Sequence, residues 1–532
     1  MEDRKRRLRA GDAVAWAAAC GLITSAAFLG YVATRYGGSW LTALAQVMLV
    51  ASGLAGAAAL WQRTGTQTLV TIVVVACVAR AVLVPWPPFQ SNDIYRYLWD
   101  GRLLAHGIDP YVVVPSSPQL HPLRVGDWLY PHIDWRDVPT LYPPFDLALF
   151  TLGAALVNVS HPSVVPLKLI LLAGDLATLG LTVLSLRKLG QPMGRLALYA
   201  WNPLVIVEFG LNGHEESFAI AFVVATIVAF RAERPFGAGV ALAGAILTKL
   251  YPAAFVPILF ARRAFVLPAF ACAAIVVAAY APFVVWNRDV FGFLHAFAFA
   301  YHFNDSLHVI LGTIGAAALF ACALAIAAFA RARGASVVAV LLGLEIAYLV
   351  SSSNVYPWYV TIFAALLPLV PNAFAGQLRP LALALVAWTA LAPLAYLAPW
   401  AMPVGSHLDI AAHALEYAPL VCALAWYALR DWRRIATVLG IAGVCGCATP
   451  ARLGPDVTRG AAFYAANCAI CHTPTATSFI GPDLTHVAAR RSRESLRAHI
   501  ATSVPDGTTF SPTTVAALVA YLNLLNERSH AK

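Results

Sequence analysis

Cys468, Cys471 and His472 form a C-x-x-C-H motif toward the carboxyl end of the chain. Two thiols at this spacing can bond the two vinyl groups of a haem, and the adjacent imidazole can bind the iron as its proximal ligand. The motif predicts one covalently attached haem c, with Cys468 and Cys471 as the attachment residues and His472 as an axial ligand of the iron. The alternative is a thioredoxin-like thiol pair or an accidental match.

The residues around this motif resemble a small class I cytochrome c domain over 452–526. A helical pattern at 460–464 precedes the motif, Gly481-Pro482-Asp483-Leu484 follows it, and an apolar-periodic helix is expected over 512–525. The resemblance implies a role in electron transfer or redox sensing, with a redox partner.

The sixth ligand of the iron departs from that resemblance. Such domains usually supply a methionine, but the methionines of this chain are Met1, Met48, Met193 and Met402, all outside the domain. Either His486 or His499 takes the sixth position, or the iron is five-coordinate. Each of these two histidines is otherwise a solvated surface residue.

A second set of residues that could do chemistry lies in the stretch 91–111. On a helix, Asp93, Arg96, Tyr97 and Asp100 share one face. A carboxylate beside apolar and aromatic surface has a raised pKa, which suits it to remove a proton from a hydroxyl. The alternative is a local Asp–Arg–Asp ion pair with no catalytic role.

The composition indicates which kind of structural element must position these residues. The chain has 532 residues, of which 60% are hydrophobic and 12% charged, whereas a soluble domain has roughly 25% charged residues. A soluble enzyme, a disordered chain and a fibrous repeat are therefore excluded. About fourteen membrane spans are expected, near 12–34, 40–61, 66–86, 164–186, 196–210, 216–230, 236–250, 252–261, 265–286, 307–330, 336–353, 357–371, 380–400 and 413–429.

The net charge of +10 fits this topology. Lys and Arg recur in every second loop and in the first nine residues, which is the positive-inside pattern and places the amino terminus in the cytoplasm. The basic excess is therefore explained by the membrane, and no nucleic-acid partner is expected. The weakest span is 236–261, where Lys249, Tyr251 and Pro252 interrupt the apolar run; two half-helices meeting at the outer surface fit the charges best.

Three regions follow from this pattern. Residues 1–434 form a multi-spanning membrane domain with a large outer loop at 87–162, in which 145–159 is expected to be a helix along the outer surface. Residues 452–532 form the polar haem domain outside the cytoplasm. Residues 435–451 are either a short fifteenth span or a lipoprotein-like signal, in which Cys447 would be cleaved and acylated.

The membrane domain resembles the GT-C glycosyltransferases, close to the polyprenyl-phosphate-mannose-dependent mannosyltransferase-like group, over about 10–430. Besides 91–111, the resemblance rests on Thr140–Pro144, Trp201–Leu204, Asn212–Glu215, Thr248–Pro252 and Tyr356–Tyr359, in the family's order. It implies a bacterial inner-membrane enzyme that transfers a hexose from a polyprenyl-phosphate donor to a lipid or glycan acceptor on the periplasmic side, with inversion.

The resemblance also implies a catalytic base, which by position is Asp93, with Asp100 as the second candidate. Because the family's acidic pair is reduced here to Asn92-Asp93, no divalent metal is expected. Arg96 and Arg102 are candidates for holding the donor phosphate, since a guanidinium offers paired donors.

Three further ionisable residues are interpreted from their places at predicted span ends. Lys249 is another candidate ligand of the donor phosphate, or else a lysine that extends its ammonium to the interface. His214 and Glu215 are expected at an outer turn, where they line an acceptor site or serve in capping and solvation.

Lys168, Asp175 and Glu345 are further ionisable residues inside predicted spans, and an internal ion pair or hydrogen bond is expected to explain them. Two other functions compete with the enzyme. In the first, the chain is an electron-transfer cytochrome whose membrane part is an anchor or docking module. In the second it is a transporter, suggested by the break at 249–252, although no inverted repeat is visible.

Overall fold

The computed structural model describes residues 2–157, 162–259, 266–287, 289–396, 407–430 and 511–530, together with Arg459, Glu494 and Ser495. Among these residues the chain is helical, with no strand and one isolated bridge between Phe303 and Asn354. The expected all-α class is therefore confirmed. The chain divides into two units, the first made of 1–294 and 303–430 and the second of 295–302 and 431–532.

Seven helices in the described residues are long and apolar enough to cross a membrane. They include α1 (Glu2–Tyr36), α2 (Trp40–Leu60), α7 (Val165–Lys188), α13 (Val266–Asn287), α15 (Leu307–Ala332), α18 (Arg379–Leu391) with the turn that follows it, and α20 (His407–Arg430). Shorter apolar helices complete the first unit, among them α3 (Thr66–Ala81), α10 (Glu216–Arg231), α11 (Pro235–Thr248), α16 (Val337–Ser351) and α17 (Thr361–Leu366).

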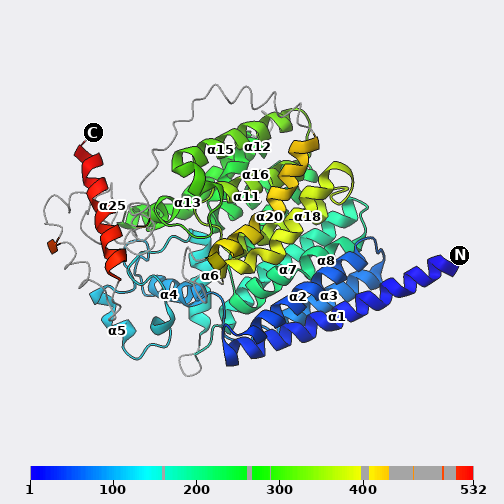
Figure 1. Cartoon of the computed structure of the whole chain (residues 1–532), viewed down its shortest axis with the longest axis horizontal. Helices are drawn as coiled ribbons and strands as arrows, with labels where there is room; N and C mark the ends of the chain where they lie inside the picture. Colours follow the sequence, from blue (N-terminus) through cyan, green and yellow to red (C-terminus); the bar gives the residue numbers. More distant parts are fainter. Residues whose placement is uncertain are drawn as a thin grey trace. The chain divides into compact units, whose positions relative to one another are not determined.

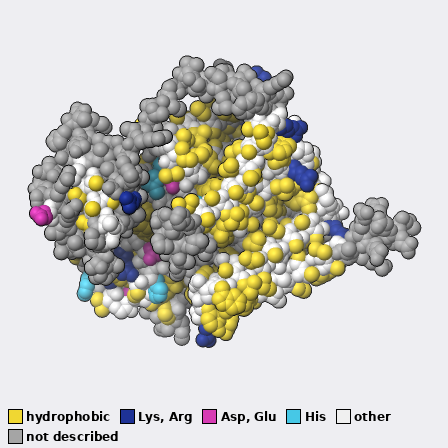
Figure 2. All heavy atoms as spheres, in the orientation of Figure 1, with side chains coloured by type: hydrophobic (Ala, Val, Ile, Leu, Met, Phe, Trp, Pro, Cys, Tyr) yellow, Lys and Arg dark blue, Asp and Glu magenta, His cyan; other side chains and the backbone are white. Residues whose placement is uncertain are grey.

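The helices of the first unit pack in neighbouring pairs (Figure 1). Helix α1 packs along α2 and α3, α10 packs against α7 and α11, and α15 packs against α16. Figure 2 shows hydrophobic side chains gathered over a wide face of these helices. On α15, Ile314 is 87% exposed. Apolar side chains turned outward in such number are characteristic of helices that lie in lipid, and the chain is a helical membrane protein.

Two expected spans are broken. The run 196–210, expected as one span, is divided into short pieces ending in α9 (Pro203–Val205) and a π-helix, η4 (Ile206–Asn212). The reason is local, because Pro203 has no N–H to donate and the Asn202 side chain instead accepts from Leu204 and Val205. The interruption expected near Lys249 is confirmed: α11 ends at Thr248, Lys249 is extended, and the chain continues in η5 (Tyr251–Phe255) and α12 (Val256–Leu259).

The segment expected as an outer loop contains two helices that pack on each other, α4 (Asp93–Ala105) and α6 (Pro144–Leu156). Their contact depends on Gly101, where an added Cβ would lie 2.2 Å from the carbonyl carbon and oxygen of Phe150. Only glycine allows the two backbones to approach this closely. Helix α6 has 13 residues, about 20 Å at 1.5 Å per residue, which is too short to cross a bilayer.

In the second unit the structure describes α25 (Pro512–His530). Val515, Leu518, Val519 and Leu522 are buried, at the spacing of one helix face, so the helix expected over 512–525 is confirmed. The haem-attachment residues Cys468, Cys471 and His472, the candidate ligands His486 and His499, and the segment 435–451 with Cys447 lie outside the described residues.

Candidate active site

Asp93 is the first residue of α4, and its position follows from the turn before the helix. Its backbone N–H is accepted by the Ser91 hydroxyl at 3.2 Å, and a carboxylate in the first turn is favoured by the helix dipole. Asp93 is partly exposed, whereas the next eight residues of α4, from Ile94 to Gly101, are buried. It is therefore an acidic group held on a rigid element and still open to solvent.

Burial raises the pKa of Asp93 to about 6. Glu215 and Asp134 act in the same direction through their negative charges, while His214 and Lys249 oppose them. An aspartate with this pKa is mostly ionised at pH 7 and is well matched to accept a proton from a hydroxyl.

Asp100, the second catalytic candidate, is fully buried and paired with Arg96. The Arg96 guanidinium donates to Asp100 Oδ1 at 2.8 Å, to the carbonyl of Trp135 at 2.9 Å and to the carbonyl of Val138 at 3.0 Å. The local ion pair considered for this helix is thus present between Arg96 and Asp100. Through the two carbonyl contacts, Arg96 also binds the segment 135–138 to α4.

A cluster of four ionisable side chains lies where α10 begins and α11 ends; we call His214, Glu215, Glu216 and Lys249 the central cluster. The first three are buried, so the solvation expected for His214 and Glu215 is wrong. The Lys249 ammonium lies 2.6 Å from Glu215 Oε1 and 2.7 Å from Glu216 Oε1. Two carboxylates therefore contact the same ammonium.

Local backbone geometry brings the central cluster against α4. Gly213 ends the π-helix in the left-handed region with φ of 76°, and a Cβ at this position would lie 2.7 Å from Ile94 Cδ1. Glycine is therefore required both by the backbone conformation and by the close approach to α4.

Tyr97 connects the central cluster to the helix that carries Asp93. Its hydroxyl donates to Glu215 Oε2 at 2.5 Å and lies 3.3 Å from His214 Nδ1. On its other side, His214 Nε2 is 3.3 Å from Glu208 Oε2. Tyr97 is fully buried, so this polar link is shielded from water.

Aromatic rings pack against His214 and Lys249. The His214 ring stacks on Trp358 at 3.8 Å, and Trp358 stacks on Tyr356 at 4.4 Å. The Lys249 ammonium lies 5.1 Å from the centre of the Tyr359 ring, within the range of a cation–π interaction. The Tyr356–Tyr359 motif therefore packs directly on the central cluster.

The remaining predicted ionisable residues have partners of their own. Arg102 donates to Asp127 Oδ1 at 2.6 Å on a partly exposed part of the loop. Arg80 pairs with Asp175, whose Oδ1 also accepts from the Tyr199 hydroxyl at 2.7 Å, and Lys168 donates to the Trp86 carbonyl at 2.6 Å. An internal pair or hydrogen bond thus explains Asp175 and Lys168, as expected.

Two groups of residues were missed by sequence reasoning. Tyr97 was placed on the correct face without a role, and Glu208 and Glu216 were not singled out. A signal was available, because Glu208, Glu215 and Glu216 are acidic residues within or beside strongly apolar sequence, where each has a high cost unless it has a partner.

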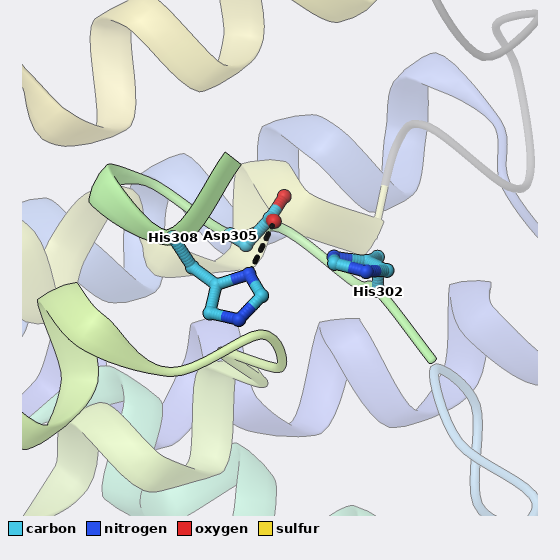
Figure 3. A group of neighbouring side chains, drawn as sticks. All are labelled: His302, Asp305 and His308. Atoms are coloured by element: carbon cyan, nitrogen blue, oxygen red, sulfur yellow. Dashed lines mark ion pairs between the residues drawn. The ribbon is translucent and has the colours of Figure 1, made fainter. Parts of the chain in front are cut away.

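Histidines and carboxylates also meet at the start of α15, where His308 Nδ1 lies 3.6 Å from Asp305 Oδ2 (Figure 3). The third residue labelled there, His302, belongs to the second unit and is not counted with this pair. In the first unit, His214, Glu215 and Glu216 also lie close enough to one another to hold a metal ion, but Lys249 already lies against both carboxylates.

Two separate parts of the chain match known protein families. Residues 10–265 match the family model described as α-(1→6)-mannopyranosyltransferase, N-terminal domain, and residues 455–522 match that of cytochrome c oxidase, cbb3-type, subunit III. No solved structure matches the chain.

Two curated relatives agree with these matches. An α-(1→6)-mannopyranosyltransferase A of Corynebacterium glutamicum is 32% identical over 166 residues, which are 29% of this chain and 31% of that protein. A cytochrome c-553-like protein of Synechocystis is 39% identical over 77 residues, 13% of this chain and 70% of that protein. The match thus spans less than a third of the mannosyltransferase but most of the cytochrome.

The C-x-x-C-H motif lies inside the region matched as a cytochrome, and a cytochrome c domain carries haem c. The carboxyl-terminal part of the chain therefore belongs to the cytochrome c family, and it is joined to a membrane part that matches the N-terminal domain of the α-(1→6)-mannopyranosyltransferases.

Proposed function

We propose that the chain is a membrane glycosyltransferase that moves a mannose-like hexose from a polyprenyl-phosphate donor to a lipid or glycan acceptor on the periplasmic side of the inner membrane, with Asp93 as the base. The observation that carries this proposal is Asp93 itself, a partly exposed carboxylate with a pKa of about 6 beside a buried polar network. The family match over 10–265, which contains Asp93, supports the reaction class.

The proposed reaction has the following steps. Asp93 accepts the proton of an acceptor hydroxyl, and the hydroxyl oxygen forms a bond to C1 of the sugar. The bond between C1 and the phosphate oxygen breaks, and polyprenyl phosphate leaves with the electron pair. Attack from the side opposite the phosphate gives inversion of configuration.

The contacts of the cations limit which of them can hold the donor phosphate. Arg96 is fully engaged by one carboxylate and two carbonyls, and Lys249 by two carboxylates. Arg102 is nine residues beyond Asp93 on α4, about 13 Å along the axis, which is more than the length of one sugar ring. We therefore do not assign the phosphate to these residues, and we retain Asp93 rather than the paired Asp100 as the base.

Replacement of Asp93 by Asn tests the proposal. General-base catalysis contributes about 10²- to 10⁴-fold, so D93N should lower sugar transfer by that factor while the haem spectrum is unchanged. The matched control is D137N, an exposed aspartate of the same loop, which should transfer sugar normally. If D93N leaves every glycan of the host membrane unchanged, the membrane part is better explained as the anchor of an electron-transfer cytochrome.

For the carboxyl-terminal domain we propose electron transfer or redox sensing through its haem. Transfer rates measured with the haem held reduced and held oxidised separate these roles. A rate that changes with the redox state indicates sensing, and equal rates exclude redox control of the sugar reaction.

A further inference from the structure

We propose that the Lys249 ammonium occupies the place that a divalent metal ion would take between Glu215 and Glu216. Through its contact with Glu215, Lys249 also positions Tyr97 on the helix that carries Asp93. This inference rests on the proposed function and deepens it, because it predicts that sugar transfer needs no metal ion. It gives Lys249 a positioning role in place of phosphate binding.

The geometry of the cluster carries the inference. His214, Glu215 and Glu216 are 1%, 0% and 4% exposed, and one ligand atom from each lies within 4.8 Å of the others, as in a metal site. A nitrogen and two carboxylates of this kind suit manganese or zinc. Lys249, from a different part of the chain, brings one ammonium to within 2.7 Å of both carboxylates. The positive charge that such a cluster needs is thus supplied by the chain.

The position of Lys249 is set by the break between α11 and η5. At this residue the backbone is extended, with φ of −141° and ψ of 135°, so the side chain leaves the end of α11 and is not wrapped against the helix. The rings of Tyr142 and Tyr359 lie 5.9 Å and 5.1 Å from the ammonium. These rings favour a cation at this point and restrict its movement.

The effect on the reacting group passes through hydrogen bonds. Lys249 contacts Oε1 of Glu215, and Tyr97 donates to Oε2 of the same carboxylate. Tyr97 is four residues beyond Asp93, one turn further along α4. Loss of the ammonium removes the cation that contacts both buried carboxylates, which is unfavourable, and the resulting rearrangement reaches α4 through Tyr97.

The first experiment uses the unmodified full-length chain in detergent. Mn²⁺ is titrated in, and free Mn²⁺ is followed by electron paramagnetic resonance, with E216Q as the control for surface binding. Equal Mn²⁺ binding by the two proteins, and sugar transfer unaffected by EDTA, are expected. The inference is overturned if the unmodified chain binds one Mn²⁺ that E216Q does not bind and if EDTA abolishes sugar transfer. This test needs no Lys249 variant.

The second experiment compares two substitutions that remove the same charge. K249A leaves space for an ion, whereas K249M fills it with apolar atoms of similar length. K249A should bind one Mn²⁺ per chain at least about tenfold more tightly than K249M, and adding E216Q should abolish that site. Surface histidines and the Asp305–His308 pair are present in both variants, so any Mn²⁺ that they bind does not affect the comparison. Failure of K249A to bind Mn²⁺ contradicts the inference.

A third measurement separates positioning from a general structural role. Asp93 is surrounded by His214, Glu215, Lys249 and Asp134, and the Lys249 charge lowers its pKa. In K249M the acid side of the pH–rate profile should move to higher pH and the rate at pH 7 should fall about tenfold or more, whereas K249R should restore both. An unchanged profile in K249M refutes the positioning role. Mn²⁺ binding by K249A requires no sugar transfer, so it can succeed even if D93N shows that the proposed function is wrong.

Discussion

The contact between α4 and α6 allows a prediction about the position of Asp93. In G101A the new Cβ would lie 2.2 Å from the carbonyl carbon and oxygen of Phe150 and 2.6 Å from the amide nitrogen of Thr151. Non-bonded carbon atoms prefer about 3.5 Å or more, so the two helices must separate by about 1.3 Å. Because the contacted atoms belong to the backbone, no side-chain rotation can relieve the clash.

The expected effects are on both stability and rate. Overpacking of this kind costs about 1–3 kcal/mol, so the membrane part of G101A should unfold at a lower temperature in detergent. A shift of about 1 Å in a reacting group can lower the rate about 10²-fold, and Asp93 lies two turns before Gly101 on the same helix. Sugar transfer in G101A membranes should therefore fall by roughly that factor while the haem spectrum is retained.

G180A provides the matched control. Gly180 lies inside α7, with a helical backbone and no atom within 4 Å of an added Cβ. Alanine is the better helix former by roughly 1 kcal/mol, so this variant should be as stable as the unmodified chain or slightly more stable. If G101A and G180A have the same unfolding temperature and transfer rate, the close approach of α4 and α6 does not position Asp93.

Three other measurements follow from the same contacts. Because burial raises the pKa of Asp93 to about 6 and the base acts when ionised, sugar transfer should be complete above that pH and lost as the pH falls through 6; a profile that is flat down to pH 5 contradicts the role of Asp93. Y97F removes a hydrogen bond to a carboxylate worth about 1.5–3 kcal/mol and should lower transfer about ten- to hundredfold with normal expression. R96M leaves the buried Asp100 unpaired and should cost about 3–5 kcal/mol of stability, whereas R102M breaks a partly exposed pair and should cost about 1 kcal/mol or less; equal unfolding temperatures for the two variants would be inconsistent with this difference.

The sequence was informative wherever a structural requirement acts over a few residues. The C-x-x-C-H motif is set by the covalent chemistry of haem, and its interpretation agrees with the family matched over 455–522. The interruption at Lys249, Tyr251 and Pro252 was visible because a charge and a proline cannot continue an apolar helix. The Arg96–Asp100 pair was visible as an i,i+4 pair on one helix.

The central cluster could not be predicted in the same way. Tyr97, Glu215 and Lys249 are separated by more than 30 residues at each step, so no local spacing relates them. The contact between these residues depends on the packing of α4 and on Gly213. This glycine ends the π-helix in the left-handed conformation, and local propensity does not predict a π-helix. Sequence reasoning therefore found most of the charged residues of the site but assigned several of them to solvent or phosphate, because the nearest partner of each is far away along the chain.

The charged residues of the site occur at helix ends, and this has one physical reason. A regular helix in a membrane satisfies its own backbone and turns apolar side chains outward, so it offers little to a charged group. Asp93 stands at the first turn of α4, His214 and Glu215 follow the end of the π-helix, and Lys249 stands where α11 ends. At each of these points a helix begins or ends. A site built from helix ends in this way keeps its charges paired with one another rather than with lipid, which is the condition for holding several ionised groups in so apolar a protein.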